Sequence, residues 1–135
     1  MNPQRHRAYA AAAEFRVRLL SFQRRTEQVA ARVGLTPERY LLLLLVQAGE
    51  LDGRPLTITA LCEPLQMTQS SVSHLVDGSL RAGLLEKTVD ARDRRRQHLA
   101  VSARGLRALE TTFDALGPDR AALADALAGT QISPS

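Results

Sequence analysis

The chain has 135 residues, of which 44% are hydrophobic and 24% charged; this is enough for one globular domain and excludes wholesale disorder. The 18 lysines and arginines exceed the 14 aspartates and glutamates, and the formal net charge of +4 favours a polyanionic partner without identifying it. A single cysteine, Cys62, excludes an intramolecular disulfide, and the longest apolar run, Leu41 to Val46, is too short to span a bilayer. We therefore expect a cytoplasmic protein with no membrane partner.

The first predicted element is a long helix from about residue 5 to residue 33, ended by Gly34. Its apolar positions alternate in steps of four and three residues, as in a heptad repeat: Ala8, Ala12, Phe15, Leu19, Phe22, Thr26, Val29 and Val33. Such a stripe can pack on the chain's own core. It is longer than a small domain needs, however, so we expect part of it to face another subunit.

The second predicted helix begins at Thr36-Pro37, a typical cap followed by a proline at the first helical position, and runs to about Ala48. Its run of leucines places it at the buried centre. Glycines and a proline over 49–55 predict a loop, followed by a short strand or extended segment at 56–58 and a short helix at 59–66. Pro64 lies near the last turn of that short helix, where it would distort or shorten it.

The second half of the chain predicts two helices around a β-hairpin. Thr68 caps a helix that runs to about Ala82 and ends at Gly83, and strand-like segments at 84–89 and 96–101 flank a charged turn. Ser102 caps a further helix, Gly117-Pro118 breaks it, and a last alanine-rich helix ends near residue 128, before a frayed tail at 129–135.

The helix after Thr68 has one apolar and one polar face. The apolar face contains Val72, Leu75, Val76 and Leu80, whereas Gln69, Ser70, Ser73, His74, Asp77 and Arg81 fall on the other. Short polar side chains can approach base edges in a major groove without steric blocking. A solvated amphipathic helix would show the same spacing, so this helix alone does not identify a DNA-binding protein.

The turn of the predicted hairpin is strongly basic. Between residues 90 and 96 it carries four arginines and two aspartates: Arg92, Arg94, Arg95 and Arg96, with Asp90 and Asp93. Arginines on a protruding hairpin repel one another unless an anion neutralises them, and a guanidinium fits a narrow, electronegative minor groove better than an ammonium does. A solvated charged turn accounts for any single arginine, but helix, hairpin and charge in this order are more specific together.

Residues 56–105 resemble the MarR family of transcriptional regulators. The resemblance rests on the helix-turn-helix and hairpin in this order and on the wing signature D-x-R-D-x-R, which stands here as Asp90, Arg92, Asp93 and Arg95. It implies a mainly α fold with a small β-hairpin wing, a winged helix-turn-helix, in a single domain over 1–135. Residues 36–101 would bind DNA, and helices at 1–34 and 102–128 would form a homodimer.

The resemblance also implies which residues carry the function. The homodimer would bind an inverted repeat in double-stranded DNA as a repressor and be released by a small aromatic or other apolar effector, whose binding residues are unknown. The DNA-binding residues would be Thr68, Gln69, Ser70, Ser71, Ser73 and His74 of the recognition helix and Lys87, Arg92, Arg94, Arg95 and Arg96 of the wing, which Asp90 and Asp93 would structure. The dimerisation residues would be Phe15, Leu19, Phe22, Leu109, Phe113, Leu116, Leu123 and Leu127.

The sequence departs from the family pattern at three positions. His74 stands where an arginine is frequent, so the base preference is open, and Pro64 interrupts the first helix of the helix-turn-helix. Ser79 takes the place of a usual leucine, and we expect Leu80 to fill the core from the next position.

Other functions find less support in the sequence. His6, His74 and His98 have no metal-ligand spacing with one another or with Cys62, so no metal and no cofactor is expected. Ser70 and His74 imitate a nucleophile–base pair, but nothing supplies an oxyanion hole or a third member, so no enzyme is expected. Cys62 is interpreted as a small core residue rather than a redox sensor. The remaining alternative is a winged-helix protein–protein module that does not bind DNA; it should carry an uncharged or acidic wing.

Overall fold

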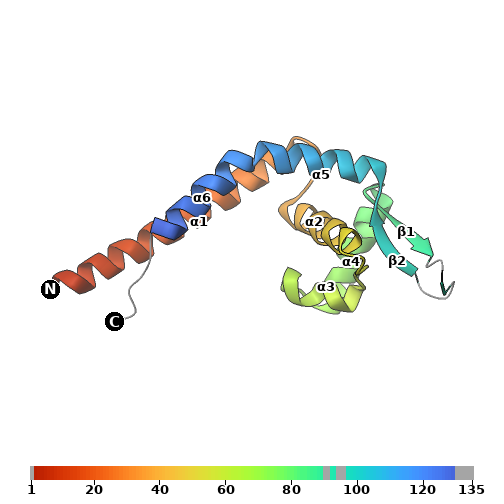
Figure 1. Ribbon diagram of the computed structural model, residues 1–135, viewed down its shortest axis with the longest axis horizontal. Coiled ribbons are helices and arrows are strands. Elements are labelled where there is room, and N and C mark those ends of the chain that lie inside the picture. The colour runs from red at the N-terminus through yellow and green to blue at the C-terminus, as the bar shows by residue number, and fades with distance from the viewer. Residues whose placement is uncertain (1, 90–91, 94–96, 130–135) are drawn as a thin grey trace.

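The computed structural model describes residues 2–89, 92–93 and 97–129, which form helices and one two-stranded antiparallel sheet (Figure 1). The prediction of a mainly α fold with a β-hairpin is confirmed. In chain order the elements are α1 (Pro3–Ala31), α2 (Pro37–Leu51), α3 (Ile58–Leu65), α4 (Gln69–Arg81), β1 (Leu85–Val89), β2 (Gln97–Val101), α5 (Ala103–Ala115) and α6 (Gly117–Gly129).

The molecule has a head and a stalk (Figure 1). The head contains α2, α3, α4 and the hairpin, whereas α1 and α6 lie side by side and extend away from it, with α5 as the link. An ion pair of 3.6 Å between Arg25 Nε and Asp119 Oδ2 joins α1 to α6. No helix in the described part of the chain is long and apolar enough to cross a membrane.

Three predicted helix starts are confirmed by their caps. The Thr36 hydroxyl accepts the Arg39 N–H at 3.2 Å and the Thr68 hydroxyl accepts the Ser71 N–H at 3.1 Å. The Ser102 hydroxyl accepts an N–H of α5 in the same way, at 2.9 Å. Each side chain satisfies a backbone donor that has no partner inside the helix, which fixes where the helix begins.

Left-handed residues follow four of the helices. Gly34 and Gly83 have φ of 76° and 75°, as predicted for residues that end helices, and Gly53 after α2 has φ of 69°. The fourth is Gln66, with φ of 56°, after which the Met67 N–H donates to the Cys62 carbonyl at 3.1 Å. The sharp turn between α3 and α4 is therefore made without a glycine.

Of the short strand and the extended segment predicted at 56–58, the structure has the extended segment: Thr57 is extended and caps α3, which begins at Ile58. One boundary before the loop that precedes α3 is wrong. The second helix does not stop near Ala48 but continues through Gly49 to Leu51. A Cβ on Gly49 would lie 2.8 Å from the Arg54 carbonyl oxygen, so this glycine allows the following loop to pass close to the helix rather than ending it.

The core of the head is centred on α2, as predicted. Its fully buried side chains come from three helices: Leu42, Leu43 and Val46 of α2, Leu61 of α3, and Val72 and Val76 of α4. Cys62 is half-buried beside this core, and its thiol donates to the Ile58 carbonyl at 3.4 Å. The hydrophobic contacts of α2 with α3 and α4 thus hold the helix-turn-helix in place.

The structure corrects the expectation that Leu80 takes the place of residue 79 in the core. Ser79 is fully buried, and its hydroxyl donates to the Leu75 carbonyl at 2.8 Å. Leu80 is only half-buried and does not replace it. The helical repeat explains this, because residue 79 follows Val72 and Val76 on the same face whereas residue 80 is turned about 100° away.

Candidate nucleic-acid interface and adjoining cavity

Helix α4, the predicted recognition helix, presents a polar face to solvent. Gln69, Ser70 and His74 are exposed, and Ser73 is half-buried at the edge of this face. Because these side chains are grouped around the first two turns, they lie near the end of the helix at which backbone N–H groups and the helix dipole favour an anion. The geometry suits a contact with base edges or phosphates.

Thr68 and Ser71 form the cap at the start of α4. Besides accepting the Ser71 N–H, the Thr68 hydroxyl donates to the Ser71 hydroxyl at 3.0 Å. Both side chains are exposed and could also reach a ligand, but their established contacts are with each other. Their contribution to binding is therefore first to fix where the helix starts.

The hairpin places the base of the wing beside α4. Leu85 pairs with Val101 and Lys87 with Leu99, so these four side chains share one face of the hairpin. Leu85 and Leu99 are buried on that face, whereas Lys87 is exposed. A hollow of about 260 Å³ separates the hairpin from α4 and the start of α3, and Lys87 is one of its lining residues.

Only part of the predicted wing lies within the described residues. Arg92 is exposed and Asp93 half-buried. The remaining predicted wing residues, Asp90, Arg94, Arg95 and Arg96, lie outside the described residues.

The hairpin is attached tightly to α5. The Ser102 hydroxyl donates to the Gly83 carbonyl at 2.5 Å, and the Ser102 N–H donates to the Leu84 carbonyl at 3.0 Å. One turn later, a Cβ on Gly105 would overlap the Leu84 carbonyl oxygen and would lie 2.9 Å from its carbonyl carbon. Glycine at 105 is thus required for α5 to lie directly on the backbone that leads into the wing.

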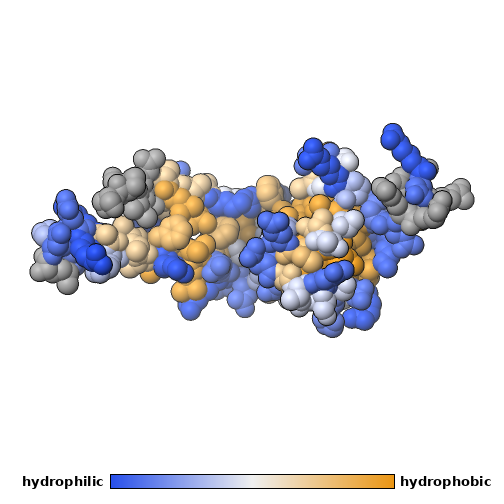
Figure 2. All heavy atoms as spheres, turned by 90° about the horizontal axis from the view of Figure 1, so that it is seen from below, coloured by the Kyte–Doolittle hydropathy of each residue, from blue (hydrophilic) through white to orange (hydrophobic). Residues whose placement is uncertain are grey.

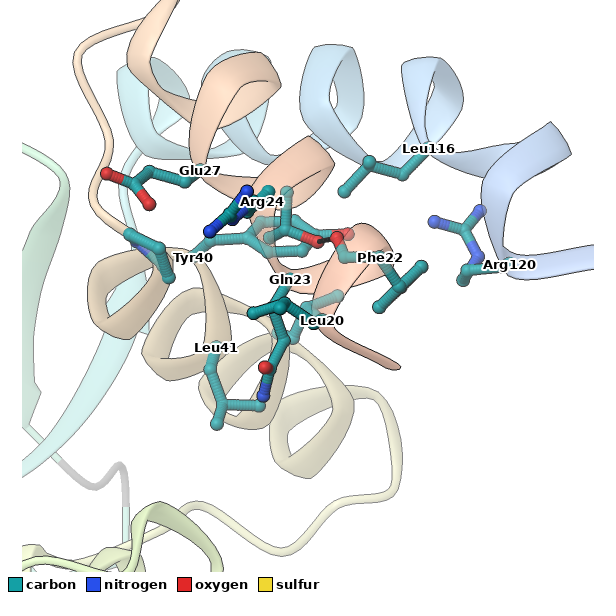
Figure 3. Close-up of a pocket in the computed structure, with 12 residues that line it drawn as sticks. Leu20, Phe22, Gln23, Arg24, Glu27, Tyr40, Leu41, Leu116 and Arg120 are labelled. Carbon is teal, nitrogen blue, oxygen red and sulfur yellow. Dashed lines mark hydrogen bonds between the residues drawn. The ribbon is translucent and has the colours of Figure 1, made fainter. Parts of the chain in front are cut away.

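A cavity of about 630 Å³ lies where the stalk meets the head, between α1, α2 and the junction of α5 with α6 (Figure 3). Most of its surface is apolar and is contributed by residues such as Leu20, Phe22, Leu41 and Leu116. The polar and charged residues of its lining are Gln23, Arg24, Thr26, Glu27, Tyr40 and Arg120. A mainly apolar surface with polar groups at a few points is typical of sites for small organic molecules.

Tyr40 and Arg120 are the polar pair of this cavity. Burial raises the pKa of the Tyr40 phenol, and the positive charge of Arg120 opposes that rise. The Arg120 guanidinium lies over the ring of Phe113, 3.8 Å from its centroid. Its Nη1 is buried and makes no hydrogen bond within the described part of the chain. A buried donor of this kind is costly unless an acceptor meets it, so the cavity favours an acceptor at this point.

Residues 33–96 match the family model described as the MarR family. The matched segment contains α2, the helix-turn-helix and the first strand of the hairpin, and it ends just before β2. Over this segment the chain matches the MarR family.

Solved structures extend the likeness over the remaining helices. MepR of Staphylococcus aureus, a transcription regulator of the multidrug efflux pump MepA, superposes with a TM-score of 0.71 and 23% identity, covering 90% of this chain and 84% of that chain. An S. aureus MepR–DNA complex superposes with a TM-score of 0.69 and 24% identity, covering 90% of this chain and 82% of that chain. S. aureus MepR bound to ethidium bromide superposes with a TM-score of 0.64 and 24% identity, with the same coverage of both chains. At this identity the likeness shows the fold. No curated protein matches the chain.

The predicted dimerisation residues fall into three groups by their exposure. Leu109 and Leu116 are buried in the chain's own core, at 5% and 1% exposure, so their surface is not available to a second chain. Phe15, Phe113 and Leu127 keep 38%, 46% and 43% exposure. Leu19, Phe22 and Leu123 are half-buried. Figure 2 shows hydrophobic side chains gathered along the stalk.

Sequence reasoning about the MarR-family pattern missed the cavity and its polar pair. Tyr40 comes from α2, Arg120 from α6 and Phe113 from α5, and nothing in the spacing of these residues along the chain predicts that they meet. No group of three or more histidines, cysteines, aspartates or glutamates in the described residues could hold a metal ion.

Proposed function

We propose that this protein is a transcriptional regulator that binds an inverted repeat in double-stranded DNA as a homodimer and represses the promoter in which the repeat lies. The exposed polar face of α4, held on the head by buried Val72 and Val76, is the observation that carries this proposal. The MepR structure solved in complex with DNA has the same fold and supports it.

Two kinds of DNA contact follow from the geometry. Ser70, Ser73 and His74 lie on the groove-facing side of α4 and read base edges. Lys87 and Arg92, with the further arginines predicted for the wing, contact phosphates and the adjacent minor groove. Base contacts supply specificity, whereas phosphate contacts supply affinity that falls with salt.

The test uses DNA fragments selected from a genomic library by the purified protein. We expect an inverted repeat with half-site centres about 10 bp apart. His74→Ala should cost on the order of 1–3 kcal/mol on this operator and little on a scrambled duplex. Arg92→Ala should weaken both duplexes and reduce the salt slope by about 1.

Three outcomes would contradict the proposal. Selection of direct repeats or single half-sites would contradict the two-fold arrangement. An equal loss on both duplexes for His74→Ala would show that α4 does not read bases. Failure to shift any duplex, even at low salt, would favour a protein–protein interaction module instead.

The homodimer is proposed from the exposed apolar side chains of the stalk. An apolar stripe on a helix pair that projects from the head needs a cover, and a second copy of the same stripe can supply it with two-fold symmetry. Light scattering at micromolar concentration should give the dimer mass. Introducing Asp at both Phe15 and Phe22 should abolish the dimer and DNA binding together, and a wild-type protein of monomer mass would refute the proposal.

The cavity supports a mechanism in which a small aromatic ligand releases the protein from DNA. The positive charge of Arg120 favours a ligand that is an anion. Arg120 offers a buried nitrogen to an acceptor on the ligand, and the apolar walls accommodate a ring. Benzoate and naphthoate should weaken operator binding in the wild type and not in Arg120→Met. The cation ethidium, bound by MepR in its solved structure, is the comparison ligand. Equal effects of the carboxylates on both proteins would place their site elsewhere.

A further inference from the structure

The recognition helix is flanked by two different elements of the head. On one side, the start of α3 and the hairpin contribute Thr57, Thr59 and Lys87 to the hollow that also contacts α4. On the other side, the first turn of α2 contributes Thr36 and Glu38 to an open hollow of about 470 Å³ that also touches α4. A helix that enters a major groove has a phosphate backbone on each side, so both flanks face DNA when α4 does.

Arg39 of α2 lies against α4 at Gly78. A Cβ built on Gly78 would be 3.2 Å from Arg39 Nη2, closer than ordinary van der Waals contact. Glycine in the middle of a helix is destabilising relative to alanine. Here it leaves room for the guanidinium to lie directly on the helix, one turn beyond His74 and beside the polar face.

The charge of Arg39 has no counterpart in the described part of the protein. The side chain is half-buried, yet no hydrogen bond or ion pair joins it to another described residue. Neighbouring Glu38 and Asp77 of α4 are exposed and form no ion pair with it in that part of the chain. A guanidinium has five donors in a fixed plane, and a phosphate is the anion whose geometry matches them.

We propose that Arg39 binds a backbone phosphate of the operator, on the strand that faces α2 when α4 occupies the major groove. It thereby adds a DNA contact outside both the recognition helix and the wing. This inference rests on the proposed DNA-binding function. Because Arg39 touches α4 at Gly78, it also fixes how far α2 and α4 stand apart at the DNA surface.

The experiment measures the affinity of the full chain for its selected operator and for a scrambled duplex over a range of salt concentrations. Arg39→Met keeps the apolar part of the side chain and removes the charge. We expect it to weaken both duplexes by on the order of tenfold and to reduce the slope of log K against log salt by about 0.9. Arg39→Lys should restore most of the slope, because a phosphate contact needs the charge.

Arg7→Met is the matched control, since it removes the same charge from an exposed position near the tip of the stalk, away from α4 (Figure 1). It should leave the slope unchanged. If Arg39→Met lowers thermal stability but leaves the slope at the wild-type value, Arg39 serves only to pack α2 on α4 and the inference is wrong. A wild-type protein that binds no duplex would instead remove the proposed function itself, so the two failures are distinguishable.

Discussion

Replacing Gly105 by alanine adds one methyl group at the point where α5 lies on the backbone of Leu84. The new Cβ would overlap the Leu84 carbonyl oxygen and approach its carbonyl carbon to 2.9 Å. Both are backbone atoms that cannot rotate away, so α5 must move by about 1 Å or more, and overpacking of this kind typically costs about 1–3 kcal/mol.

The same movement weakens the hydrogen bonds around Ser102. The Ser102 N–H bond to Leu84 and the cap to the Gly105 N–H, at 3.0 and 2.9 Å, are each worth about 1 kcal/mol. The higher helix propensity of alanine returns only about 0.5–1 kcal/mol. The net expectation is a loss of about 2–3 kcal/mol in the free energy of unfolding.

Urea denaturation followed by circular dichroism measures this loss. The control is Gly117→Ala, because a Cβ at Gly117 meets nothing closer than Arg120 Nη2 at 3.8 Å. That variant should be as stable as the wild type or slightly more stable. Since Leu84 leads directly into β1, Gly105→Ala should also weaken operator binding under conditions in which the variant is still folded. Equal stability of the two variants would refute the close approach on which this reasoning depends.

Three further predictions concern the cap, the cavity and the recognition helix. Thr68→Ala should cost about 1 kcal/mol of stability and Thr68→Ser almost nothing, as measured by chemical denaturation. In a Tyr9→Phe background, the Tyr40 phenolate absorbance should appear above the ordinary tyrosine pKa, and Arg120→Met should raise that pKa further. Because the unfolded phenol ionises first, the stability that Tyr40 contributes should be lost as pH rises through its raised pKa; no loss on alkaline titration would contradict this. Ser70→Ala, like His74→Ala, should lower the affinity for the operator more than the affinity for a scrambled duplex.

The sequence predicted those parts of the fold that depend on local chemistry. Thr36, Thr68 and Ser102 cap helices where expected, and Gly34 and Gly83 end them, because a side-chain oxygen or a left-handed residue acts on neighbours within a few positions. The order of helix-turn-helix and hairpin followed from these signals. The exposed polar face of α4 followed from its periodicity alone.

The parts that sequence reasoning missed depend on contacts between distant segments. The sequence predicts a loop at Gly49 because glycine usually interrupts helices. In the structure Gly49 lies within α2, and a glycine is needed there because the backbone of Arg54 passes close to the helix. Arg39 of α2 lies against Gly78 of α4, and no local pattern in the sequence indicates this contact. Gln66 has no local signal for a left-handed conformation, since a glycine is usual there.

The pairing of α1 with α6 constrains the order in which the chain can fold during synthesis. The contacts of the head join neighbours along the chain, such as α3 with α4 and β1 with β2, and these can form as soon as each segment has been made. The ion pair between Arg25 and Asp119 needs residues from opposite ends of the described chain. Until α6 emerges from the ribosome, the face of α1 that packs on α6 is uncovered, in addition to Val17 and Leu20, which stay exposed in the complete structure. Nascent chains of this protein should therefore depend on chaperones mainly through their first helix, and should be released from them when the last helix has been made.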